Sequence, residues 1–298
     1  MKNIPVLHVT ETSLAEAYEK ALVSLYTKGT RFKTQYDKPG DPESLDCTMN
    51  ITILEPESDP MIHQAFPGGL DDLKEYVLEL KGFKDHWVKN MNDPDDTRWE
   101  YTYHGRLVNY GSWKEYFGSG EQMERIDAGF KIDQIENVIQ KLLEQPFTRQ
   151  AQMITWMPNI DREVYDPPCL QSLWYRILEN EDGTQWLNCN IRFRSNDAWG
   201  ANFMNMFGFV QFNREVIADE IAKRSGKVVK LGRLNWHADS YHIYGKDIQQ
   251  AREMLFNRIN DMPFENRIFN FHDEFIRQMY DDAEPRILEK IKKYDESH

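Results

Sequence analysis

One cysteine in this sequence is placed to act as a nucleophile. Cys169 follows two prolines in the run DPPC, where a strand is expected to begin. Proline fixes its own φ and restrains its neighbour, so the thiol is held in a defined position. Arginines nearby would lower the pKa of this thiol and favour the reactive thiolate. The alternative is a buried, unreactive thiol, which is the commonest state of a free cysteine and the one we expect for Cys47 and Cys189.

Two arginines could provide a site for an anion. Arg149 lies in the run PFTRQ, directly after a strongly amphipathic helical segment, and Arg194 lies on the polar face of a predicted strand. A guanidinium group binds a phosphate through two hydrogen bonds. Taken singly, each arginine could equally be a solvated surface side chain. Together with a fixed thiol, they indicate an anion site.

Three further polar side chains could take part in chemistry. Glu75 lies in a predicted helix and could act as a general acid or base, or simply face water. His242 and Tyr244 are two residues apart in the run DSYHIYG, so on a strand both side chains would face the same way. Both could then bind a hydroxyl group, although packing in the core would explain the same pattern.

Hydrophobic periodicity predicts the elements that must position these side chains. Apolar residues at helical spacing, followed by glycine or proline, predict helices over residues 12–27, 70–81, 132–146 and 201–224. Short or alternating apolar runs predict strands over residues 47–56, 151–158, 169–178 and 185–195, with a hairpin turn at 181–184. Residues 37–44 and 90–132 are expected to form loops.

The order of these elements indicates an α+β fold. The strands cluster in the middle of the chain, so we expect a central mixed or antiparallel β-sheet with helices packed on one side, in a single domain over residues 1–298. The run QWLNCNIRFRS shows that one face of this sheet would be apolar and the other polar. The predicted core residues are Leu187, Cys189, Ile191 and Phe193, and the predicted outward residues are Asn188, Asn190, Arg192 and Arg194.

The composition limits which partners the chain can bind. Its 298 residues include 36 basic and 49 acidic side chains, for a net charge of −13, which argues against a nucleic acid polymer as the main partner. A single phosphate needs only a few local arginines and is compatible with this charge. The 3 cysteines form neither a metal-binding pattern nor a disulfide framework, and their odd number suits the reducing cytoplasm. The first 25 residues do not resemble a signal peptide, and no apolar run is long enough to cross a membrane, so we expect no membrane partner.

Four spaced runs between Leu14 and Gln250 resemble the thymidylate synthase superfamily, which includes thymidylate synthases and pyrimidine nucleotide hydroxymethylases. The family's run of arginine, tryptophan and Pro-Cys corresponds to TRQAQMITWMPNIDREVYDPPC, and its Arg-Ser-x-Asp…Asn run corresponds to RSNDAWGANFMN. Its His-x-Tyr run corresponds to HIY, and its glutamate seven residues before a glycine corresponds to EYVLELKG. The resemblance implies the α+β fold and the one-carbon chemistry of this superfamily.

The resemblance further implies a covalent mechanism on a pyrimidine nucleoside monophosphate. Cys169 would add to C6 of the ring, and C5 would then attack the one-carbon unit of the cosubstrate 5,10-methylenetetrahydrofolate. Glu75 would organise water and move protons, and Tyr103 in EYTYHGRL resembles the active-site tyrosine of the family. No metal is implied.

Binding roles also follow from the resemblance. Arg194 and Ser195 resemble phosphate ligands, and Arg149 resembles the phosphate ligand that the second subunit of a homodimer donates. Lys38, in YDKPGDP, would replace an arginine of the family's N-terminal phosphate loop. The remaining matches are Asp197 for folate, Asn205 for the edge of the base, and His242 and Tyr244 for the sugar hydroxyl.

Departures from the family pattern bear on the product. Gln150 stands where the family has a second arginine, Leu170 stands where thymidylate synthases have a histidine, and KIKKYDESH lacks the apolar tail that seals the folate site. A more open site would let water reach the exocyclic methylene, so we predict 5-hydroxymethylation of (d)CMP or dUMP. Asn205 could pair with uracil or, flipped, with cytosine, so the base stays open.

Two other functions remain as alternatives. The first is thymidylate synthesis, the reductive methylation of dUMP by the same residues. The second, from another class of protein, is a nucleotide- or RNA-binding regulator that keeps the fold without turnover. The acidic charge and the set of Cys169, Arg194 and Glu75 argue against such a regulator.

Overall fold

Local signals at the ends of the helices set the framework of the molecule. The computed structural model describes residues 3–88, 96, 98–111, 114–117, 124–127, 131–162 and 164–297. Helix α1 (Leu14–Lys28) begins with a capping box, in which Ser13 and Glu16 each accept the backbone N–H of the other. Helix α2 (Leu70–Leu80) is followed by Gly82, whose φ of +90° favours glycine. Helix α4 (Gln134–Glu144) is capped by Asp133. These helices are confirmed predictions.

A seven-stranded mixed sheet forms the centre of the fold. Its order is β1-β3-β10-β9-β8-β7, with β2 paired to β3. β1 is parallel to β3 and β10 is parallel to β9, whereas the other neighbours are antiparallel. The predicted α+β class is therefore confirmed. The strands are β1 (Val6–Glu11), β2 (Thr30–Phe32), β3 (Ser44–Ile53), β7 (Gln152–Ile154), β8 (Leu170–Glu179), β9 (Gln185–Asp197) and β10 (Val229–Ile243).

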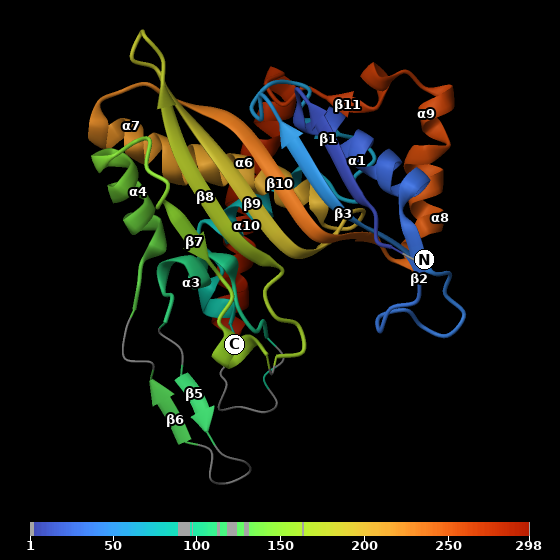
Figure 1. Ribbon diagram of the computed structural model, residues 1–298, viewed down its shortest axis with the longest axis horizontal. Helices are drawn as coiled ribbons and strands as arrows, with labels where there is room; N and C mark the ends of the chain where they lie inside the picture. Colours follow the sequence, from blue (N-terminus) through green and yellow to red (C-terminus); the bar gives the residue numbers. More distant parts are fainter. Residues whose placement is uncertain are drawn as a thin grey trace.

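Helices cover one face of this sheet (Figure 1). The helical stretch after β9 consists of α6 (Asn202–Phe212), a π-helical turn η3 (Asn213–Ala218) and α7 (Asp219–Ser225), and it ends at Gly226 as predicted. Helix α10 (Glu274–Ser297) packs on α2, which in turn packs on α6. The four core residues predicted on β9 are at most 2% exposed, so the sidedness of the sheet is also confirmed.

Short elements make up most of the remaining connections. They are β4 (Ile62–His63), η1 (Asp85–Trp87), α3 (Tyr103–Val108), β5 (Lys114–Phe117), β6 (Glu124–Asp127), α5 (Pro158–Asp161), η4 (Gly245–Asp247), α8 (Ile248–Ala251), η5 (Arg252–Phe256), α9 (Arg258–Asp261), η6 (Phe264–Asn266) and β11 (Ile268–Phe269). The loop predicted at residues 37–44 is present up to Ser44, where β3 begins.

Several elements differ from the prediction. β1 was not expected, and β10 is far longer than the HIY run that indicated it. The range 90–132, expected to form loops, contains α3 and the β5–β6 pair. α3 forms because the Thr102 hydroxyl accepts the backbone N–H of Gly105 at 3.0 Å and caps the first turn. Within that range, residues 90–95, 97, 112–113, 118–123 and 128–130 lie outside the described part of the chain.

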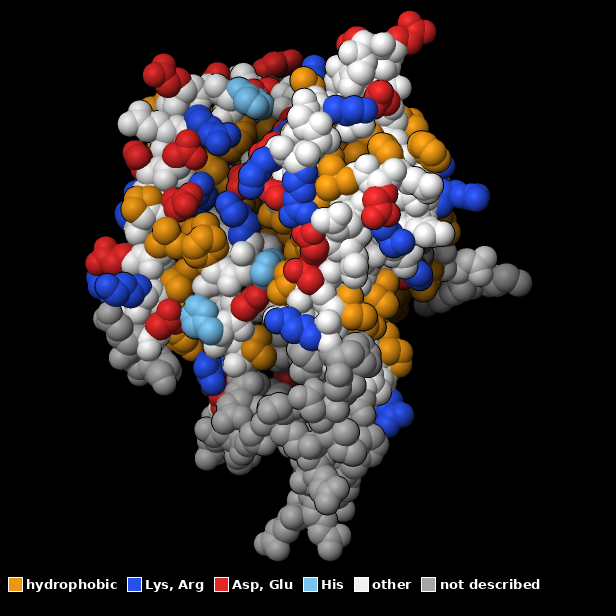
Figure 2. Space-filling model, turned by 90° about the vertical axis from the view of Figure 1, so that its left-hand side faces the viewer, with side chains coloured by type: hydrophobic (Ala, Val, Ile, Leu, Met, Phe, Trp, Pro, Cys, Tyr) orange, Lys and Arg blue, Asp and Glu red, His pale blue; other side chains and the backbone are white. Residues whose placement is uncertain are grey.

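The surface mixes charges of both signs. On the face drawn in Figure 2, acidic and basic side chains of the described residues are interspersed, so the net negative charge is not gathered into one patch there. Among the described helices, none combines the length and the apolar character that crossing a membrane requires.

A buried ion pair ties the start of α3 to the segment that leads towards Cys169. The Arg106 guanidinium donates to both carboxylate oxygens of Asp161, at 2.7 and 3.0 Å, and both side chains are at most 2% exposed. Arg106 also donates to the carbonyl of Thr155, and Asp161 accepts the backbone N–H of Met157. The pair therefore fixes the chain between β7 and α5.

Replacing Arg106 by Met should lower the free energy of unfolding by about 3–5 kcal/mol, because Asp161 would be left buried without its cation. Urea denaturation followed by circular dichroism measures this change. Arg192→Met is the matched control, since the Arg192–Asp239 pair is exposed, and it should change stability by less than about 1 kcal/mol. Equal effects of the two substitutions would contradict the structural role of the buried pair.

Candidate active site

A cavity of about 590 Å³ lies where α2, α3 and α6 meet the ends of β9 and β10 and the start of β8. Its wall combines side chains from distant parts of the sequence. Seven of the predicted site residues line it, namely Tyr103, Cys169, Ser195, Asp197, Asn205, His242 and Tyr244. The structure therefore brings together most of the residues that the sequence singled out.

The backbone around Cys169 is held by hydrogen bonds on both sides. The Cys169 carbonyl accepts the backbone N–H of Arg194 at 2.8 Å, and the backbone N–H of Leu170 donates to the Tyr103 hydroxyl at 3.3 Å. The Arg194 guanidinium donates to the carbonyls of Pro167 and Pro168, the latter at 3.0 Å. The thiol therefore has a fixed position, as the two prolines predict, and Arg194 lies directly behind it.

The pKa of the Cys169 thiol differs from the expectation. Burial raises it, Arg194 opposes this rise, and Asp166 adds to it, so the pKa lies above its ordinary value. The prediction that arginines would bring this pKa down is wrong in its net direction, because loss of water outweighs one partly buried cation. Cys47 and Cys189 are buried, and burial raises the pKa of each to about 12, as befits the unreactive thiols predicted.

Three tyrosines surround Cys169, and the sequence indicated only one of them. Tyr76 and Tyr101 line the cavity beside Tyr103, and the rings of Tyr101 and Tyr103 are 5.7 Å apart. Burial raises the pKa of all three phenols, so they are neutral hydrogen-bond donors at physiological pH. The Tyr76 hydroxyl is buried and has no hydrogen-bond partner among the described residues. Tyr101 could have been found from its alternation with Tyr103 in EYTYHG, whereas Tyr76 carries no such signal.

A chain of hydrogen bonds orients His242. The Ser240 hydroxyl donates to Asp46 at 2.6 Å, and its oxygen lies 3.2 Å from His242 Nδ1. The Ser240 carbonyl oxygen lies 3.4 Å from the same nitrogen. Both neighbours of Nδ1 are acceptors, so we assign the proton to Nδ1. Nε2 then offers a lone pair at the cavity wall, and this buried atom has no partner in the described part of the chain.

The turn between β9 and α6 fixes the end of the cavity where Asn205 lies. The Asp197 carboxylate accepts the backbone N–H groups of Trp199 and Gly200 at 3.1 and 2.9 Å. A Cβ at Gly200 would lie 2.5 Å from the Asp197 carboxylate, so this close approach requires glycine. Asn205 follows one turn into α6 and is only 8% exposed, with its side chain in the cavity wall.

Four predicted residues lie outside the cavity wall, and Arg194, behind Cys169, is one of them. Arg149 is exposed between α4 and β7, where its carbonyl accepts the indole N–H of Trp174. Lys38 is exposed in the loop before β3, and its backbone N–H donates to Asp41. Glu75 faces a neighbouring cavity of about 420 Å³, where Lys84 lies 2.6 Å and Lys290 3.0 Å from its carboxylate.

Glu79, four residues after Glu75 on α2, lies in the wall of the Cys169 cavity. It lies one helical turn further along α2 and lines both cavities. Burial raises the pKa of Glu79 to about 7, and Lys84 opposes this rise. Residues four apart share one face of a helix, so the spacing EYVLE could have indicated Glu79 as a second candidate.

Comparison with known proteins identifies the family. The family model described as thymidylate synthase matches residues 73–285. This chain belongs to the thymidylate synthase family. It is therefore a member of a family of folate-dependent one-carbon transferases, and the predicted enzyme class is confirmed.

Several relatives extend this match over most of the chain. A protein of Methanocaldococcus jannaschii named "Putative thymidylate synthase" is 28% identical over 244 residues, which cover 80% of this chain and 91% of the relative. A protein of the same name from Methanothermobacter marburgensis is 30% identical over 171 residues, which cover 51% of this chain and 71% of the relative. The solved thermostable thymidylate synthase A from Bacillus subtilis shares the fold, with a TM-score of 0.55 at 17% identity, over 82% of this chain and 84% of that one.

Among the described residues, no three side chains of His, Cys, Asp or Glu converge in a way that could hold a metal ion. The cavity wall presents a thiol, phenols, an amide, an imidazole and carboxylates.

The alkylation of Cys169 should report its raised pKa. In a Cys47→Ala, Cys189→Ala background, the rate of reaction with iodoacetamide should reach half its maximum at a higher pH than that of free cysteine measured in parallel. Arg194→Gln should move this midpoint further up, because it removes the cation that favours the thiolate. A midpoint below that of free cysteine would contradict the dominance of burial.

Proposed function

We propose that this chain transfers a one-carbon unit from 5,10-methylenetetrahydrofolate to C5 of a pyrimidine nucleoside monophosphate, and that the product is the 5-hydroxymethyl derivative of (d)CMP or dUMP. One observation carries this proposal: a single cavity is lined by Cys169, Asn205 and His242. It thus combines a nucleophile, an amide suited to the edge of a pyrimidine, and an acceptor for a sugar hydroxyl. We extend the proposal to one catalytic domain over residues 1–298, acting in the cytoplasm.

The two cavities could hold the two substrates side by side. The nucleotide cavity and the neighbouring cavity share Tyr76, Glu79 and Met204. Phe66, Trp199 and Phe203 give the second cavity apolar surface against which a flat heteroaromatic ring would pack. These residues fit the pterin of folate, which supplies the one-carbon unit, and Asp197 holds the turn that carries Trp199.

The reaction begins at Cys169. Once the thiol has lost its proton, the sulfur adds to C6, and the electron pair of the C5–C6 bond makes C5 a nucleophile towards the one-carbon unit. Loss of the C5 proton and departure of tetrahydrofolate then leave an exocyclic methylene on the ring. Tyr103, whose hydroxyl accepts the N–H next to Cys169, lies beside this ring face.

In the final steps of the proposed reaction, water rather than a hydride adds to the exocyclic methylene. Water adds to the methylene carbon and gives one proton to Glu79, and the electron pair returns to the ring and expels the Cys169 thiolate from C6. This sequence needs no oxidant or reductant. A carboxyl with a pKa of about 7 on the wall between the cavities supports it, because such a group both accepts and returns a proton at neutral pH.

We assign the phosphate of the nucleotide to Arg194 and Ser195, with Lys38 as a further ligand. Arg194 lies behind Cys169, and Ser195 lines the cavity. The loop that carries Lys38 approaches the sugar end of the cavity, since Ser44 accepts the backbone N–H of Gly245 and the Tyr36 and Tyr244 rings are 6.1 Å apart.

The proposal includes a homodimer in which Arg149 completes the partner's site. Arg149 is exposed and lies outside the wall of its own cavity. Near it, Phe147 is 63% exposed and Leu178 on β8 is 56% exposed. Exposed apolar side chains of this size beside an arginine are typical of an interface.

Tritium release from C5 tests the reaction. Incubation with 5,10-methylenetetrahydrofolate and C5-tritiated dUMP, UMP, dCMP or CMP should release tritium with one of the bases, and the product should be heavier by one hydroxymethyl group. Cys169→Ala should reduce release by about 10³-fold or more while nucleotide binding persists in calorimetry. Cys189→Ala is the control and should stay active, because Cys189 is buried on β9.

The same assay has outcomes that would overturn the proposal. Normal turnover by Cys169→Ala would remove the covalent mechanism. Dihydrofolate formed one-to-one with product, followed by absorbance, would show reductive methylation instead. Absence of release with all four nucleotides would favour the regulator without turnover.

Mixing an impaired variant with an inactive one tests the shared site. Arg149→Gln should lower kcat/KM by about 10-fold or more. When it is dissociated in mild denaturant and reassociated with Cys169→Ala, each hybrid dimer should have one intact site, so about a quarter of wild-type activity should return. Each variant carried alone through the same treatment is the control. If Arg149 served its own subunit, no activity would return.

A further inference from the structure

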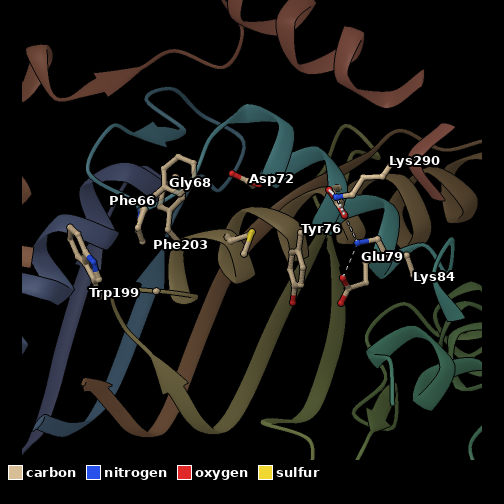
Figure 3. A pocket seen from close by; sticks show the side chains of 13 residues that line it. Phe66, Gly68, Asp72, Tyr76, Glu79, Lys84, Trp199, Phe203 and Lys290 are labelled. Carbon is tan, nitrogen blue, oxygen red and sulfur yellow. Dashed lines mark hydrogen bonds and ion pairs between the residues drawn. The ribbon is translucent and has the colours of Figure 1, made fainter. Parts of the chain in front are cut away.

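One lysine lies between two of the carboxylates of α2. The Lys84 ammonium is 2.6 Å from the Glu75 carboxylate and 3.8 Å from the Glu79 carboxylate. Glu75 faces only the second cavity, whereas Glu79 lines both. Figure 3 shows Lys84 between the carboxylate of Glu79 and the side chain of Lys290.

Lys84 is held in place by aromatic rings as well as by carboxylates. Its side chain is only 5% exposed, and its ammonium lies 4.9 Å from the centre of the Trp87 ring and 5.3 Å from that of Trp99. A buried cation needs such compensation, because leaving water is costly. The ammonium therefore has little freedom to move away from the two glutamates.

Helix α10 contacts Glu75 through Lys290, and it contacts Trp87 through Tyr294 and Asp295. The Lys290 ammonium lies 3.0 and 3.1 Å from the two Glu75 oxygens. The Trp87 ring packs on Tyr294 at 4.3 Å, and its indole N–H donates to Asp295 at 3.0 Å. The apolar face of α10 is anchored on Leu78 of α2 through Ala283, Ile287 and Ile291. Through Lys290, α10 therefore contributes a charged side chain to the wall of the second cavity.

We infer that Lys84 is a positioning residue for Glu79, and that α10 adjusts it through Lys290 and Glu75. This inference rests on the proposed function, in which Glu79 exchanges a proton with water. When Lys84 stays with Glu75, Glu79 can take up a proton. When Lys84 turns towards Glu79, that carboxyl stays ionised.

The charges around Glu79 define the expected effects. Burial raises its pKa to about 7, Lys84 lowers it, and Glu75 and Asp85 raise it. Other charged or titratable side chains also line the two cavities around Glu79. They come from α2, the segment that leads into α3, the loop before β8, the β9–α6 turn, the end of β10 and α10. These residues are Asp72, Tyr76, Arg98, Glu100, Tyr101, Tyr103, Asp166, Cys169, Asp197, His242, Tyr244 and Lys290. Lys84 is the cation nearest to Glu79 among the ion pairs of the described residues.

Direct titration of Glu79 tests the inference without any turnover. The protein is labelled with [δ-¹³C]glutamate, and the Glu79 signal is assigned by its loss in Glu79→Gln. Lys84→Met should raise the titration midpoint by about one pH unit or more, because it removes the neighbouring cation. Glu75→Gln should lower the midpoint, because it removes a negative neighbour and frees Lys84 to approach Glu79. Lys290→Gln should raise it by less than Lys84→Met.

Controls separate this effect from a general loss of structure. Lys293→Gln, which removes an exposed pair with Glu289 on the same helix, should leave the midpoint unchanged. If Lys84→Met fails to fold, Glu75→Gln and Lys290→Gln still give shifts of opposite sign. Shifts of the same sign, or none, would overturn the inference. Since the titration needs no substrate, failure of the proposed reaction leaves this result readable, and in an active enzyme the pH limb of tritium release should move with it.

Discussion

The hydrogen bonds that hold the backbone of residues 167–170 are the constraint on which the site depends. The Arg194 guanidinium binds the carbonyls of Pro167 and Pro168, and the Arg194 N–H binds the carbonyl of Cys169. Both contacts follow from the antiparallel pairing of β8 and β9, which places the first residue of one strand opposite the end of the other. A shift of this register by one residue would turn Arg194 to the opposite face of the sheet and release the loop. The sheet therefore positions the proposed nucleophile as well as forming the core of the fold.

Burial gives the cavity an electrostatic character of its own. It raises the pKa of Cys169, of Glu79 and of the three tyrosines, and so favours the neutral form of each acid. Two cations beside these groups, Arg194 and Lys84, are engaged by carbonyls and carboxylates. In the proposed reaction, proton movement therefore has to precede or accompany the addition of the thiol.

The elements that the sequence revealed are those whose signals are local. Helices α1 and α4 have capping residues and a regular apolar face, and β9 alternates without interruption, so their prediction needed no tertiary information. β1 was missed because a short N-terminal strand is defined by its neighbour β3 rather than by its own pattern. Long-range pairing likewise extends β10 well beyond the run that indicated it.

The site could be predicted in its chemistry but not in its electrostatics. Resemblance identified Cys169, Asn205 and His242, which the fold brings into one cavity. It could not separate Glu75 from Glu79, because residues four apart lie on the same helical face and only the tertiary structure shows which of them lines the Cys169 cavity. The pKa of Cys169 depends on burial, which no local pattern encodes.

The hydrogen-bond chain from Asp46 through Ser240 to His242 has a consequence for which nucleotides can bind. In the proposed function, the Nε2 lone pair of His242 accepts a hydrogen bond from the sugar hydroxyl, whereas an ether or a fluorine there would set two lone pairs against each other. The enzyme would therefore leave unmodified any nucleotide whose sugar hydroxyl is blocked. It would modify only nucleotides whose free hydroxyl can still be joined to a further nucleotide.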